Sequence, residues 1–187
     1  MSTALNKVLI VGSAPDAVKT AHWDTSCFSH TVVINNAWKA CPSWSCLIYP
    51  EDFPIDRHPS AKDMNGKRMV TAEEFVPDQN EFGGFVYAGG TMSFTAGYWS
   101  LGALKPDVIA YIGCDMVYET KPGQATHLDG AARPTPCAAM SPCKALKPNL
   151  CAFRLWPIKT AVPWSTCRNL KTPGFAFHAW LLRRLKS

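Results

Sequence analysis

Polar side chains that are able to bind or react follow directly after apolar runs of this sequence. Gly12 and Ser13 end the run VLIVGS, Asn35 and Asn36 follow TVVI, and Asp115 follows VIAYIGC. An amide donates and accepts hydrogen bonds together, and a carboxylate accepts them from ribose hydroxyls or a base. Glycine, serine, asparagine and aspartate are equally common where strands simply turn. Ligand binding and plain turns therefore both remain open at these positions.

The segment GGTMS, residues 89–93, precedes a helical pattern and suggests a second binding turn. Gly90 frees the backbone to approach a ligand, while the start of the helix adds N–H donors and the hydroxyls of Thr91 and Ser93. An ordinary turn in which Thr91 or Ser93 caps the helix explains the same residues equally well.

His127 is the candidate for acid–base chemistry among five histidines. Its ordinary pKa lies near neutral pH, so it can accept a proton there. It stands in a long aperiodic segment, and it reaches the strand ends if this segment folds back over them. A merely solvated loop histidine is the alternative.

Short apolar runs bounded by Gly, Pro and Asn predict the elements that position these residues. Strands are predicted over 7–12, 31–38, 46–53 and 108–115, and an edge strand over 68–75. Helices are predicted over 15–21, within 89–107, around 150–156 and over 175–185, with a short strand around 162–166. The alternation predicts a Rossmann-like α/β fold, a mostly parallel sheet flanked by helices. Ligands bind at the carboxyl ends of such strands, so we expect the polar residues named above to gather there.

The 187 residues suggest one nucleotide-binding domain over 1–187, with 116–150 as an irregular loop or lid. The net charge of +5 suits a phosphorylated ligand and is too small to indicate nucleic acid. We expect no membrane span, and with no export signal in MSTALNK we expect a cytoplasmic protein. Homo-oligomerisation stays open.

The eight cysteines are expected to be reduced and to act mostly as small buried hydrophobes. They lack the close pairs typical of zinc sites, because the shortest gap, from Cys41 to Cys46, holds four residues. A metal site formed by cysteines near His127 is the remaining alternative (Cys137, Cys143 and Cys151).

The order of the motifs resembles the bacterial sialyltransferase-like glycosyltransferases. It is carried by VLIVGSAPD, VVINNAW, LIYPEDF, GGTMSFTAGYWSLGALKPDVIAYIGCDMVY and THLDG, over roughly residues 7–130, with a weaker likeness at 162–175. The resemblance implies a Rossmann-like domain that transfers a sugar from a CMP-sugar without a metal or other cofactor. Its partners would be the nucleotide-sugar and a glycan or small-molecule acceptor.

Residue by residue, the resemblance places Gly12, Ser13 and Pro15 on a first nucleotide turn and implies that Asn35 or Asn36 contacts the cytidine nucleotide. The remaining implied site residues are Gly90, Thr91, Ser93 and Asp115 for the nucleotide, His127 as general base and Tyr118 at the leaving phosphate. The chain departs from the family's pattern at Ser13 and Ala14, and at Pro50 and Glu51, where asparagines or glycine are usual.

Two further hypotheses stay open. A neighbouring group with the same strand motifs includes pterin diphosphokinase-like proteins, and that diphosphate transfer would need magnesium held by Glu51, Asp52 and Asp115. The altered first turn also fits a non-catalytic module that binds a nucleotide or sugar.

Overall fold

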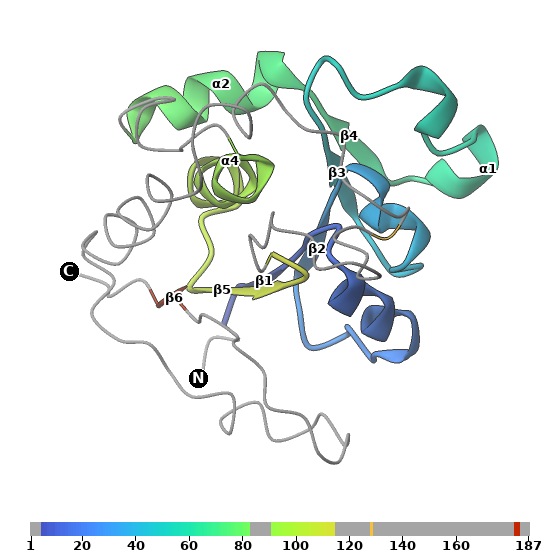
Figure 1. The fold of residues 1–187 in the computed structure, drawn as a ribbon. Coiled ribbons are helices and arrows are strands. Elements are labelled where there is room, and N and C mark those ends of the chain that lie inside the picture. The colour runs from blue at the N-terminus through green and yellow to red at the C-terminus, as the bar shows by residue number, and fades with distance from the viewer. Residues whose placement is uncertain (1–4, 83–90, 115–127, 129–181, 184–187) are drawn as a thin grey trace, which may run out of the picture.

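The chain has a Rossmann-like α/β fold built on a largely parallel sheet. A computed structural model describes residues 5–82, 91–114, 128 and 182–183 (Figure 1). Five parallel strands lie in the order β4-β3-β2-β1-β5, and β6 pairs antiparallel with β5. The strands are β1 Lys7–Val11, β2 His30–Ile34, β3 Cys46–Ile48, β4 Arg68–Val70, β5 Val108–Ile112 and β6 Leu182–Arg183. The predicted fold class is confirmed.

The helical elements fill the connections between these strands. They are the 3-10 helices η1 Pro15–His22, η2 Asn35–Lys39 and η3 Ile55–Arg57, the α-helices α1 Ala61–Met64, α2 Ala72–Glu81 and α4 Met92–Trp99, and the π-helix η4 Ser100–Leu104. None of the helices in the described ranges is sufficiently long and apolar to cross a membrane.

Both faces of the sheet are covered, because alternate residues of each buried strand point to opposite sides. On one face Leu9, Val33 and Leu47 pack with η1 and η2 through Ala17 and Ala37. On the other face, strand residues pack against α2 and α4 (Val8, Ile10, Val32, Ile48 and Ile109 against Phe75, Ala96 and Trp99). Figure 1 shows α4 and η1 on opposite sides of β1.

Two sequence predictions are wrong in this part of the chain. The strand predicted over 68–75 ends at Val70, and residues from Ala72 onward form α2, which contains Pro77. The helix predicted over 175–185 is contradicted at Leu182–Arg183, which extend the sheet as β6 beside β5. The packing of α2 and the pairing of β6 with β5 therefore override the structures that the local sequence of these two segments favours.

The other predicted elements differ mainly in their bounds. The first helix forms as predicted but as a 3-10 helix, and β2 ends at Ile34, so that Asn35 and Asn36 begin η2. The helix expected within 89–107 is α4 continued by η4, and it ends at Lys105, whose φ is +48°, before Pro106. The segment predictions around 116–150, 150–156 and 162–166 lie outside the described residues, apart from Leu128.

Candidate site at the carboxyl edge of the sheet

The carboxyl ends of β1, β2, β3 and β5 lie along one edge of the sheet. Val11 is level with Val33 on β2 and with Ile112 on β5, and Ile34 is level with Ile48 on β3. The residues that follow these pairs therefore share the edge. The strand order reverses between β1 and β5, and this switch point is where open α/β sheets bind ligands.

The β1 turn is held closely against the β5 turn at this switch point. The Gly12 amide donates to the Ile112 carbonyl at 2.8 Å, and the Ala14 amide donates to the Gly113 carbonyl at 3.0 Å. A β-carbon on Gly12 would lie 2.6 Å from Cys114 Sγ. Gly12 therefore has a structural role in this contact, whatever its role toward a ligand.

Ser13 also meets a residue far along the chain. The Leu128 amide donates to the Ser13 carbonyl at 2.8 Å, and the Leu128 side chain packs against the apolar cluster on the η1 and η2 face. Leu128 is the residue after His127 in the sequence. The chain thus returns to the β1 turn immediately after the candidate general base.

The two asparagines after β2 have different surroundings. Asn35 is partly buried with φ of +50°, a left-handed conformation that asparagine tolerates better than most residues. Its Oδ1 is buried and has no hydrogen-bond partner among the described residues. Asn36 is buried at the start of η2 and is already engaged within the chain. The Oδ1 atoms of both asparagines are buried acceptors, and that of Asn35 is one that a ligand at the edge would satisfy.

Thr91 stands at the N-cap of α4, as the sequence suggested, but its side chain makes no capping hydrogen bond. Its Oγ1 is buried without a hydrogen-bond partner in the described ranges. The Thr91 carbonyl accepts the amides of Phe94 and Thr95, so the amides of Met92 and Ser93 precede the first helical bond. The polypeptide runs from α4 back into β5, so this helix start lies toward the carboxyl edge.

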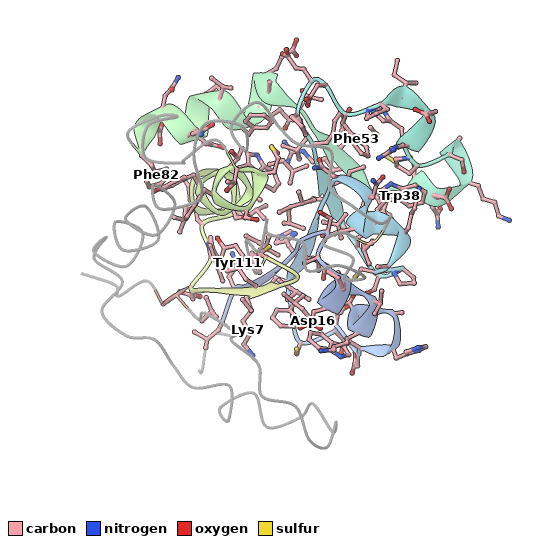
Figure 2. The ribbon with its side chains drawn as sticks, in the orientation of Figure 1. Lys7, Asp16, Trp38, Phe53, Phe82 and Tyr111 are labelled. Atoms are coloured by element: carbon pink, nitrogen blue, oxygen red, sulfur yellow. The ribbon has the colours of Figure 1, made fainter. Side chains whose placement is uncertain are left out.

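An aromatic cluster after β3 was not identified from the sequence. The Tyr49 ring lies 5.5 Å from the Phe53 ring and 4.8 Å from the His58 ring, and Phe53 and His58 are stacked at 5.2 Å between ring centroids. Burial raises the pKa of the Tyr49 phenol. Figure 2 labels Phe53 and, from η2, Trp38, whose indole N–H donates to the Arg57 carbonyl. The available signal was the spacing of Tyr49, Phe53 and His58 within ten residues of the sequence.

Tyr111 belongs to β5 and lies on the side of α4 (Figure 2). The residue is partly buried with its hydroxyl oxygen enclosed, and desolvation raises the pKa of its phenol well above the ordinary value. Tyr111 therefore remains neutral and belongs to the packing below the edge.

Four of the remaining predicted site residues are not placed by the structure. Gly90, Asp115, Tyr118 and His127 lie outside the described residues, and Ser93 is described as partly buried in the first turn of α4. The structure brings the turns that contain Gly12, Ser13 and Asn35 to one edge. The catalytic roles of His127 and Tyr118 stay predictions.

Residues suited to metal binding are few in the described ranges. Glu51 and Asp52 are exposed in the turn after β3, and the part of the chain seen here has no group of three His, Cys, Asp or Glu side chains placed to hold an ion. Cys41 and Cys46 are buried free thiols, as expected, whereas the free thiol of Cys27 is exposed. The cysteines proposed beside His127 lie outside the described residues.

Comparison of the chain with protein-family models, with curated proteins and with solved structures found no match.

Proposed function

We propose that this chain is a metal-independent glycosyltransferase that takes a sugar from a nucleotide-sugar, specifically a CMP-sugar. Among several buried polar atoms that lack a partner in the described residues, two at the carboxyl edge support the nucleotide site, Asn35 Oδ1 and Thr91 Oγ1. A buried polar atom without a hydrogen bond costs roughly 1–3 kcal/mol. A ligand with polar groups at the carboxyl edge would remove that cost.

The phosphate is expected at the start of α4 rather than in the β1 turn. In the β1 turn the Gly12 and Ala14 amides are already bonded, and Pro15 has no amide hydrogen. Asp16 places a carboxylate in the first turn of η1. The first turn of α4 contains no acidic residue and presents a helix start, which favours anions.

The chemical step follows from the sequence resemblance. The acceptor hydroxyl attacks the anomeric carbon of the sugar, the bond from that carbon to the nucleotide phosphate breaks, and the hydroxyl proton passes to His127. Such base catalysis typically contributes ~10²–10⁴-fold. Tyr118 and the α4 amides stabilise the departing phosphate. The bond from the Leu128 amide to Ser13 supports this assignment, since His127 is the adjacent residue.

The test is a transfer assay with CMP-sugars and a panel of hydroxyl acceptors, in the presence of EDTA. We expect turnover by the wild-type chain and its loss in His127→Ala, which retains CMP binding. Turnover of His127→Ala at the wild-type rate would refute the role of this histidine. Activity that appears only with magnesium and a pterin-like alcohol would replace the proposal by diphosphate transfer, and CMP binding without turnover on any acceptor would indicate a binding module.

A further inference from the structure

Tyr49, the first residue of the aromatic cluster after β3, follows β3 at the level at which Asn35 follows β2. Ile34 and Ile48 are level on neighbouring parallel strands, and Asn35 and Tyr49 are the residues that follow them. The two are therefore neighbours at the carboxyl edge. No element separates them, because β2 and β3 are adjacent in the sheet.

The backbone and the ring of Tyr49 are both held in place. The Tyr49 amide donates to the Val70 carbonyl at 3.3 Å, which ties this residue to the end of β4. Phe53 is buried and supports the Tyr49 ring, and the Phe53 carbonyl lies 3.3 Å from Nε2 of His58. Two backbone hydrogen bonds form turns within the segment: the Phe53 amide donates to the Pro50 carbonyl, and the His58 amide donates to the Ile55 carbonyl. The cluster is a fixed surface.

Tyr49 itself is only partly buried, and its hydroxyl forms no hydrogen bond with the described part of the chain. A supported and partly exposed ring, on a residue next to Asn35, whose buried acceptor has no partner in the described residues, is suited to a planar ligand. Such a ligand stacks on the ring and donates an N–H to the amide oxygen.

Strand spacing agrees with a nucleotide in this orientation. Neighbouring strands lie about 4.8 Å apart, so the end of β3 is roughly 10 Å from the end of β1 at the switch point. This is comparable to the reach of a nucleotide from its phosphate to its base. The start of α4, where the phosphate is expected, lies toward this same edge, and α4 packs against β1 and β2, so the base of a nucleotide bound there extends to β2 and β3.

We propose that Tyr49, supported by Phe53 and His58, is the surface on which the nitrogen heterocycle of the bound nucleotide stacks, beside Asn35. The inference rests on the proposed nucleotide site and adds the residue that recognises the base. It assigns base recognition to the residue just before Pro50 and Glu51, where the resemblance led us to expect an asparagine.

The experiment compares a ligand with a base and a ligand without one. CMP and ribose 5-phosphate are titrated calorimetrically into the wild-type chain, Tyr49→Phe, Tyr49→Leu and the control Ile55→Ala, which changes an exposed side chain of the same segment. We expect Tyr49→Leu to weaken CMP binding by roughly tenfold or more and to leave ribose 5-phosphate unchanged. Tyr49→Phe and Ile55→Ala should bind CMP as the wild type does.

Each other outcome overturns the inference in a distinguishable way. Equal losses for both ligands in Tyr49→Leu would mean that Tyr49 only supports the fold, and unchanged CMP affinity in Tyr49→Leu would mean that the base binds elsewhere. If Tyr49→Leu does not fold, loss of CMP affinity in Tyr49→Phe would contradict stacking. A wild-type chain that binds neither ligand would overturn the proposed function as well.

Discussion

Gly12 and Gly113 approach so closely that a β-carbon added to Gly12 would lie 2.1 Å from the Gly113 carbonyl oxygen. Gly113 itself has φ of +66°, which a side chain rarely adopts. The β1 and β5 turns thus meet backbone to backbone at the switch point. The sequence left open whether Gly12 belongs to a ligand-binding turn or to a tight turn of the backbone. The structure shows that the close contact of the β1 and β5 turns has no room for a side chain at Gly12.

Gly12→Ala is expected to destabilise the fold. The added methyl group meets the backbone of Gly113 and the sulfur of Cys114, and the backbone cannot move aside without breaking β1–β5 hydrogen bonds. We expect a loss of about 2–3 kcal/mol in the free energy of unfolding, measured by urea denaturation. Gly66→Ala is the control, because Gly66 has φ of +80° but no atom near its missing β-carbon, and should cost about 1 kcal/mol. Equal losses would contradict the steric explanation.

Thr91→Val should stabilise the ligand-free protein and weaken nucleotide binding. The substitution keeps the shape of the side chain and removes a buried hydroxyl oxygen without a partner in the described structure. We expect the free energy of unfolding, measured by thermal or chemical denaturation, to rise by about 1 kcal/mol and the affinity for CMP to fall.

Thr20→Val is the matched control for this exchange. Thr20 is buried, and its hydroxyl donates to the Ala17 carbonyl at 2.7 Å, so its removal should cost about 1 kcal/mol. A loss of stability in Thr91→Val, similar to that in Thr20→Val, would show that the Thr91 hydroxyl already has a partner in the free protein.

Asp78→Asn is expected to stabilise the protein at neutral pH. Burial against α4 and η4, followed by the charges of Glu81 and Glu74, raises the pKa of the Asp78 carboxyl despite Arg68 and Lys105. An acid whose pKa is raised on folding binds its proton more tightly in the folded state. Its ionisation therefore lowers stability as the pH rises from the unfolded to the folded pKa.

The gain from Asp78→Asn should accordingly be present at pH 7 and disappear below the ordinary pKa of an aspartate. Urea denaturation of both proteins at several pH values measures this difference. A gain that is the same at pH 3 and pH 7 would mean that the charge of Asp78 is not its cause.

The strands of the core could be predicted because the composition of each segment by itself favours a buried strand. β1, β2, β3 and β5 are short runs rich in Val, Ile and Leu that end at glycine, asparagine or proline, a pattern typical of buried parallel strands. The carboxyl edge followed from the same pattern, since parallel strands end on one side.

The errors arose where distant parts of the chain decide the structure. Residues 68–75 were predicted as an edge strand, yet α2 begins at Ala72 and accommodates Pro77 while Phe75 and Gln79 are buried in the fold. Leu182 and Arg183 lie in a sequence with helical periodicity but pair with Ile109 and Val108. The close contact of Gly12 with Gly113 and the cluster around Tyr49 depend on register and turn geometry, which a single sequence does not display.

Calorimetric titration of CMP into the wild-type chain and into Asn35→Gly is the most direct measurement on the proposed nucleotide site. Glycine adopts the left-handed conformation of Asn35 without strain, so this variant should fold at least as well while it lacks the side-chain amide. We expect the wild-type chain to bind CMP in the presence of EDTA and Asn35→Gly to bind it at least about tenfold more weakly. Absence of CMP binding by the wild-type chain, or equal affinity in the two proteins, would contradict a nucleotide site at this edge.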